Sequence, residues 1–107
     1  MVDKRLKNLE LDSKANVYFD GRVTSRSCYR EDGSRFTLGI ITPGSYTFGT
    51  GDKEILQMIA GSVEVLRPGD TDWVAFSAGD TLEVAPNCEF QIRTYGVAEY
   101  LCDYVKD

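Results

Sequence analysis

The chain contains no histidine, and this absence narrows the chemistry that its side chains can perform. It excludes a Ser-His-Asp triad, a Cys-His dyad and every zinc or iron site that depends on imidazole ligands. It also removes the commonest general base in enzymes. Any catalysis must therefore use carboxylates, Tyr, Lys, Arg, Cys or backbone groups, and the fold has to bring such groups together.

The three cysteines, Cys28, Cys88 and Cys102, do not suggest a metal or disulfide site. They lie far apart, form no Cys-x-x-Cys pair and are odd in number. We interpret them as reduced thiols in a reducing compartment, and Cys102 as a small buried apolar residue. The N-terminus lacks the apolar run of a signal peptide, and no window approaches about 18 apolar residues. A cytoplasmic protein without a membrane segment is predicted.

Size and charge limit the partners. A chain of 107 residues is one small domain. Its 12 Lys and Arg against 17 Asp and Glu give a net charge of −5, which argues against a nucleic-acid binder. One buried anion pocket is still compatible with that balance. Because so small a domain hides only about 60–65% of its unfolded surface, a closed barrel or a dimer would help it, and we predict a homodimer.

Turn residues divide the chain into short strands from Val17 onward. Clusters such as Asp20-Gly21, Asp32-Gly33 and Pro43-Gly44 recur at a spacing of about 8–12 residues, which is typical of a sandwich or barrel. The Asp-Gly pairs also favour tight hairpins. The charged segment 1–15 is predicted to be a frayed tail or short helix. We therefore expect an all-β protein: an N-terminal extension over 1–15, then a single antiparallel β-barrel or jelly roll over 16–107.

Alternation within these runs assigns side chains to faces. Tyr46 and Phe48 share one face of a strand, and Phe90 shares a face with Ile92. The last run, 99–105, is apolar on both faces, so we expect it to be covered twice, the second time by a partner subunit. Its first face carries Tyr100, Cys102 and Tyr104, and its second carries Leu101 and Val105.

The middle of the chain resembles a cupin barrel. Gly44, an alternating pair, Glu54 and then Gly61 resemble the first cupin motif, and the segment from Gly79 to Phe90 resembles a degraded second one. Metal cupins hold their ion with two alternating histidines, a glutamate and a later histidine. The matching positions here carry Tyr46, Phe48, Glu54 and Phe90. One carboxylate does not make a transition-metal site, so no metal is predicted.

A narrower resemblance covers Asn16 to Val105. The segments Asn16–Val23, Gly44–Phe48, Asp72-Trp73 and Tyr100–Tyr104 are similar, in the same order, to the small cupin-fold pyrimidine/purine nucleoside phosphorylases. The resemblance implies a pentosyltransferase of broad specificity. Such an enzyme converts purine and pyrimidine nucleosides and phosphate to the free base and (deoxy)ribose 1-phosphate. It implies no metal or organic cofactor, with inorganic phosphate as co-substrate. The charged segment 1–15 lies outside this resemblance.

The residues suit three tasks of that reaction. Aromatic faces stack on any base, so Tyr46, Phe48 and Phe90 are predicted to hold the nucleoside. Tyr100 is predicted to add a hydroxyl. Glu54 is the predicted catalytic group, because a carboxylate in an apolar barrel has a raised pKa and can exchange a proton. Phosphate is assigned to Arg35, with hydroxyls from Thr37 and Thr50. The other candidate cations are Arg22, Arg26, Arg30, Arg67, Arg93 and Lys53.

Plainer interpretations remain open. The three rings would equally fill a small barrel, and Glu54 and Arg35 would equally be solvated surface charges. The alternative function is a metal-free cupin that binds a small molecule without catalysis. A metal-dependent cupin enzyme is disfavoured by the missing histidines, and a structural dimerisation domain is the last alternative.

Overall fold

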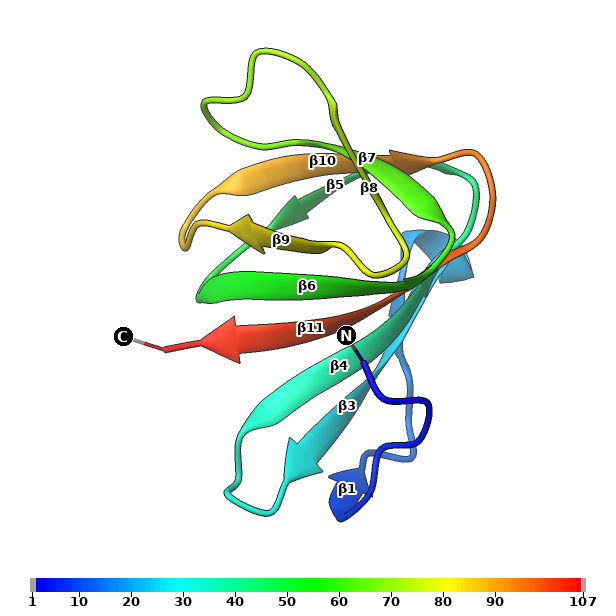
Figure 1. The fold of residues 1–107 in the computed structure, drawn as a ribbon, viewed down its shortest axis with the longest axis vertical. Helices are drawn as coiled ribbons and strands as arrows, with labels where there is room; N and C mark the ends of the chain where they lie inside the picture. The colour runs from blue at the N-terminus through cyan, green and yellow to red at the C-terminus, as the bar shows by residue number, and fades with distance from the viewer. Residues whose placement is uncertain (1, 107) are drawn as a thin grey trace.

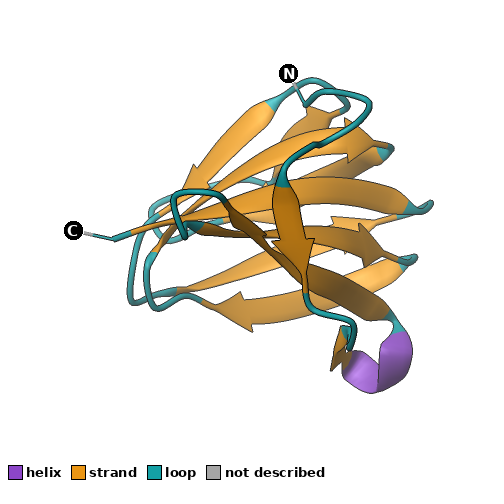
Figure 2. Cartoon of the chain, turned by 90° about the horizontal axis from the view of Figure 1, so that it is seen from below, coloured by secondary structure: helices purple, strands orange, loops and turns teal. Residues whose placement is uncertain are grey.

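The structure is a computed structural model that describes residues 2–106, and it is an all-β jelly roll of the predicted class. Two antiparallel sheets face each other, and a single 3₁₀ turn, η1 (Phe19–Gly21), is the only helix in the described residues (Figures 1 and 2). The strands are β1 (Leu9–Leu11), β2 (Asn16–Tyr18), β3 (Val23–Arg30), β4 (Arg35–Ile41), β5 (Gly44–Gly49), β6 (Lys53–Ala60), β7 (Ser62–Leu66), β8 (Val74–Ser77), β9 (Thr81–Val84), β10 (Glu89–Thr94) and β11 (Ala98–Val105).

The core lies between the two sheets. The larger sheet has the order β1-β3-β4-β11-β6-β9, with β2 paired to β3, and the smaller sheet has the order β5-β10-β7-β8. Inward side chains of both sheets are almost completely buried, among them Ile41 and Leu82 from the larger sheet and Val65 and Ile92 from the smaller one. The strands alternate between this core and the outside, as the sequence runs predicted.

The turn chemistry is also as predicted. Asp20-Gly21 lies in the connection between β2 and β3, and Gly33 lies in the hairpin between β3 and β4. Both glycines have a positive φ, +89° and +85°, which a side chain with a Cβ rarely adopts. Phe19 and Asp20 also lie in the left-handed region, at φ +53° and +56°, so the turn η1 is a strained connection.

The prediction for the N-terminal segment is wrong. Instead of a frayed tail or a helix, Leu9–Leu11 forms an edge strand on β3, with Leu9 opposite Arg30. Val2 and Leu9 pack against a second apolar cluster made by Cys28, Phe36 and Leu101 on the outer side of the larger sheet. The second face of β11 at Leu101 is therefore covered by the chain itself and needs no partner subunit there. The homodimer stays a prediction.

Candidate active site

A cavity of about 360 Å³ opens between the two sheets at one end of the barrel. Side chains from β4, β5, β6, β10 and β11 line it, together with Tyr18 of β2 and Ser25 of β3. It has an aromatic side and a side rich in hydroxyls and charge. Of the predicted site residues, the cavity brings together Glu54, Arg35, Phe48, Phe90 and Tyr100.

Glu54 points into this cavity from β6. Alternation along β6 places Glu54 on the same face as the buried Leu56 and Met58, and its register neighbours are Tyr104 on β11 and Val84 on β9. The side chain is half-buried, and burial raises its pKa above the ordinary carboxyl value. The Cys102 thiol, which donates to Oε1 at 3.6 Å, and the charge of Arg35 partly offset that rise. A carboxyl in this setting can both give and take a proton.

Three side chains of β11 form the wall beside Glu54. Tyr100, Cys102 and Tyr104 alternate onto the cavity face, and burial raises the pKa of each above its usual value. All three therefore remain protonated at neutral pH and are able to donate a hydrogen bond. The ring of Tyr100 lies against Gly39, its register partner on β4, where a Cβ would overlap the ring. Gly39 thus sets the position of that wall.

The aromatic side is built around a stacked pair. Phe48 on β5 and Phe90 on β10 are opposite each other in register, with ring centroids 5.9 Å apart and planes at 26°. Tyr18 meets Phe48 edge-on at 6.0 Å. Phe90 is almost fully buried, whereas Phe48 is partly open and offers surface to a ligand.

The structure does not bring Tyr46 to the cavity. It shares a face with Phe48, as predicted, and Phe19 of η1 packs against both rings, with centroids 5.0 Å from Tyr46 and 5.3 Å from Phe48. Its hydroxyl donates to the carbonyl oxygens of Thr42 and Pro43 at 2.8 and 3.1 Å. Tyr46 is 3% exposed and belongs to the core, which leaves base contact to its strand neighbour Phe48.

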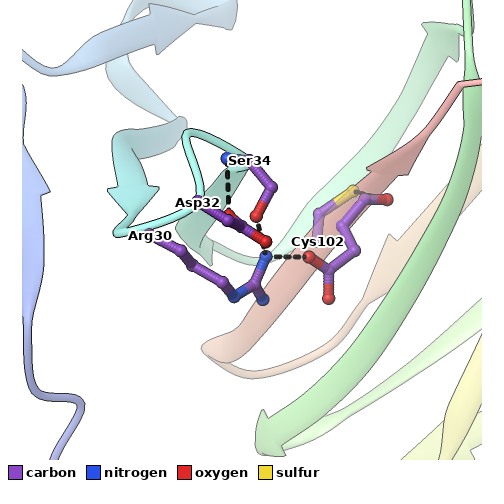
Figure 3. A network of polar contacts seen from close by, with 5 residues as sticks. Arg30, Asp32, Ser34 and Cys102 are labelled. Atoms are coloured by element: carbon purple, nitrogen blue, oxygen red, sulfur yellow. Dashed lines mark hydrogen bonds and ion pairs between the residues drawn. The ribbon is translucent and has the colours of Figure 1, made fainter.

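Arg35 is the candidate cation that lines the cavity. Its guanidinium lies 4.6 Å above the Tyr104 ring, and its other recorded partner is the Ser27 hydroxyl. Arg30, by contrast, is held by Asp103 at 2.8 Å. Figure 3 shows Arg30 beside Ser34, whose hydroxyl it contacts at 3.3 Å. The remaining candidates are engaged elsewhere: Lys53 with Glu83, Arg67 with Asp70, Arg93 with Glu64, Arg22 with the Phe19 carbonyl and Arg26 with the Ser13 carbonyl.

The two threonines predicted to assist Arg35 have other partners. Thr37 shares the inward face of Arg35 but is buried, with its hydroxyl 3.0 Å from that of Tyr104. Thr50 donates to the Ala85 carbonyl at 2.7 Å and accepts from the Cys88 amide at 3.1 Å, which closes the loop before β10. Neither residue lines the cavity. Thr37 therefore positions Tyr104, and Thr50 positions a loop.

A polar cluster beside Arg35 escaped the sequence reasoning. The Asn16 side-chain amide donates to the hydroxyls of Ser25 and Ser27 at 3.2 and 3.1 Å, and Arg35 donates to the same Ser27 hydroxyl at 3.3 and 3.4 Å. Both serines are 5% exposed, and Ser25 lines the cavity. The alternation Val23, Ser25, Ser27 places them on the inward face, and two inward serines on one strand were the available clue.

Within residues 2–106, no group of three or more His, Cys, Asp and Glu side chains is arranged to hold a metal ion. The same part of the chain contains no helix with the length and apolarity needed to cross a membrane.

Comparison with known proteins finds a family model and relatives that carry the same description. The family model described as "Pyrimidine/purine nucleoside phosphorylase" matches residues 13–104. A protein of that name from Syntrophotalea carbinolica is 48% identical over 100 residues, 94% of this chain and 96% of its own. Another, from Hydrogenovibrio crunogenus, is 46% identical over 101 residues, 94% of this chain and 97% of its own. These matches are longer than the segment 16–107, so the likeness reaches into the N-terminal extension.

Solved structures share the fold. A protein of unknown function from Acinetobacter sp. ADP1 superposes with a TM-score of 0.91 at 33% identity, covering 94% of this chain and 98% of its own. A cupin-2 domain protein from Shewanella frigidimarina superposes with a TM-score of 0.63 at 12% identity, covering 77% of this chain and 79% of its own. The second likeness shows the cupin fold alone.

Proposed function

The chain belongs to the pyrimidine/purine nucleoside phosphorylase family, and we propose that it cleaves purine and pyrimidine nucleosides by phosphorolysis within the cavity lined by Glu54, Arg35 and Phe48. It is a nucleoside phosphorylase, and hence a pentosyltransferase. Breadth of substrate and the roles of individual side chains are our proposal, as are a cytoplasmic location, a homodimer and action without a metal or organic cofactor.

The reaction exchanges one bond at C1′ of the sugar. The C1′–N bond breaks with its electron pair leaving on the base, and an oxygen of hydrogen phosphate forms the new C1′–O bond. The proton of hydrogen phosphate ends on the base nitrogen, so atoms and charge balance without a further reactant. Because positive charge develops on the sugar and negative charge on the base, the site must stabilise both.

The aromatic side fits the base. The exposed part of Phe48, stacked with Phe90 and in T-shaped contact with Tyr18 and Phe19, offers an apolar surface. Stacking on such a surface is worth about 1–3 kcal/mol per base and does not read the base's edge. A pocket that relies on stacking discriminates weakly between heterocycles, which supports acceptance of both purine and pyrimidine nucleosides.

Glu54 fits the proton transfer. Its raised pKa suits a group that passes a proton toward the leaving base, and in its ionised form it can accept hydrogen bonds from the sugar hydroxyls. Tyr100 and Tyr104, which stay protonated, donate hydrogen bonds from the same wall. The partly desolvated Glu54 opening onto the same cavity as Arg35 and the stacked phenylalanines is the observation that carries the proposal.

Incubation of the purified protein with uridine, and separately with a purine nucleoside, tests the proposal. We expect release of both bases to depend on phosphate, with one ribose 1-phosphate formed per base. Base release at the same rate without phosphate would make the protein a hydrolase. Saturable nucleoside binding without turnover would favour the metal-free binding protein.

A further inference from the structure

A cluster of hydrogen-bond donors lies beside Arg35, and two of its members, Ser25 and Arg35, line the cavity. Asn16 on β2 faces Ser25 on β3 in register, and its amide nitrogen bridges the hydroxyls of Ser25 and Ser27. Arg35, at the start of β4, donates to the Ser27 hydroxyl from the other side. The arrangement joins three strands around two buried hydroxyls.

The hydroxyl protons of Ser25 and Ser27 have no acceptor among the described residues. A serine hydroxyl accepts through two lone pairs and donates one proton. The oxygen of Ser27 accepts from both Asn16 and Arg35, which directs its own proton away from them. Ser25 likewise accepts from Asn16. Among the described residues neither hydroxyl has a recorded acceptor for its proton, although both side chains are 95% or more buried. Buried donors of this kind require an acceptor, and Ser25 opens onto the cavity.

The charge of the cluster defines that acceptor. Arg35 forms no ion pair within the described residues, and besides Ser27 it contacts the face of Tyr104. Glu54, whose pKa the charge of Arg35 lowers, lines the same cavity but is not paired with it. A cluster of one guanidinium, one amide and two hydroxyl donors, with no carboxylate in it, matches a tetrahedral oxyanion. A neutral sugar, which carries as many donors as acceptors, would satisfy it less well.

We propose that Asn16, Ser25, Ser27 and Arg35 form the subsite for the phosphate co-substrate, an inference that rests on the proposed phosphorylase function. Ser25 and Arg35 contact the oxyanion from the cavity wall, and Ser27 positions the Arg35 guanidinium through its hydroxyl. Asn16 is a positioning residue, because its two N–H groups hold the serines in the orientation that aims their protons outward. In this proposal the two serines take the role of phosphate-binding hydroxyls that the sequence assigned to Thr37 and Thr50, whose hydroxyls have other partners.

The subsite also fixes the direction of the nucleoside. With the phosphate beside Arg35 and the base on Phe48, the sugar spans the space between them, next to Glu54 and Tyr100. Phosphate and base then lie on different sides of C1′, as displacement at that carbon requires.

Single variants Ser25→Ala, Ser27→Ala and Asn16→Ala test the subsite, with the exposed Ser45→Ala on β5 as the matched control. We expect each of the three to raise the KM for phosphate by about 10-fold or more, while the KM for uridine changes by less than about threefold. Asn16→Asp keeps the shape of the side chain but replaces its donating NH₂ group by an accepting carboxylate oxygen and adds a negative charge. It should therefore raise the phosphate KM further than Asn16→Ala. Ser45→Ala should change neither constant. Sulfate should inhibit the wild-type protein competitively with phosphate, and this inhibition should be weaker in each subsite variant whose phosphate KM is raised.

The outcomes separate the two proposals. If the wild-type protein releases no base with phosphate, the proposed function fails, and the subsite is then judged by calorimetric titration of phosphate into wild type and variants. If the wild type is active and folded variants keep the wild-type phosphate KM, the subsite assignment is wrong and the function stands. An equal rise in both KM values for Asn16→Asp would reduce Asn16 to a structural residue and overturn its positioning role.

Discussion

Glu54→Gln should lower turnover and raise stability in the same molecule. The substitution keeps the size of the side chain, and the amide oxygen can still accept from the Cys102 thiol. It removes the group that exchanges a proton, and general acid–base catalysis typically contributes 10²–10⁴-fold, so kcat for uridine should fall by about that factor. The KM for phosphate should change little, because Glu54 is not part of the donor cluster around Arg35.

The stability effect follows from the raised pKa of Glu54. Because the folded protein holds this proton more tightly than the unfolded chain, the free energy of unfolding falls as the pH rises from the ordinary carboxyl value, about 4.3, to the raised value. Each unit of difference corresponds to about 1.4 kcal/mol. Above that window the glutamine variant should be more stable than the wild type, and below pH 4 the difference should vanish.

Steady-state kinetics and thermal unfolding between pH 4 and pH 8 measure both effects, with Glu99→Gln as the control because Glu99 is exposed on β11 outside the cavity. We expect the control to match the wild type in rate. Retention of wild-type kcat would remove Glu54 from the mechanism. A variant less stable than the wild type at neutral pH would refute the argument that the carboxylate is held at a desolvation cost.

The remaining predictions concern the walls of the cavity and the outer sheet. Phe48→Ala should raise the KM for uridine and for a purine nucleoside by a similar factor, about 5- to 150-fold, as measured by steady-state kinetics; an effect on one class alone would contradict stacking as the basis of breadth. Gly39→Ala should displace the Tyr100 ring, lowering the unfolding free energy by about 1–3 kcal/mol in denaturant titrations and raising the nucleoside KM, and an unchanged protein would contradict the close packing. Removal of residues 2–11 should uncover Cys28, which is 0% exposed, and speed its alkylation by a thiol reagent, whereas unchanged reactivity would show that the extension does not cover the sheet.

The fold class could be predicted because the residues that define its strands and turns lie close together in the sequence. Turn residues at regular intervals and alternating apolar side chains define the strands, and β11 (Ala98–Val105) extends the predicted run 99–105 by one residue. The strand β1 could not be found in this way. It is only three residues long. It is stabilised by pairing with β3, where Leu9 lies opposite Arg30, and by packing of Leu9 against the outer apolar cluster, and neither contact leaves a pattern in the local sequence.

The site was predictable only in part, for a related reason. Periodicity places Phe48 and Phe90 on inward faces, and the cupin spacing places Glu54 there. All three line the cavity in the structure, and their roles stay predictions. Tyr46 has the same periodicity, yet it is 3% exposed and its hydroxyl donates to the carbonyl oxygens of Thr42 and Pro43. Periodicity gives the face of a side chain but not these hydrogen-bond partners.

The donor cluster was missed because it depends on tertiary register. Asn16 reaches Ser25 and Ser27 because β2 folds back along β3, which brings residues about ten positions apart into contact. Thr37 and Thr50 show the converse case. Their types suit phosphate, but buried neighbours engage their hydroxyls, and such partners are visible only in three dimensions.

A crystal structure with phosphate and a C-nucleoside, whose carbon–carbon glycosidic bond resists cleavage, tests the central claim most directly. The account predicts the base against Phe48, the phosphate on Arg35 and Ser25, and C1′ between them beside Glu54. Ligands bound outside this cavity, or a phosphate with no contact to Arg35, would contradict it.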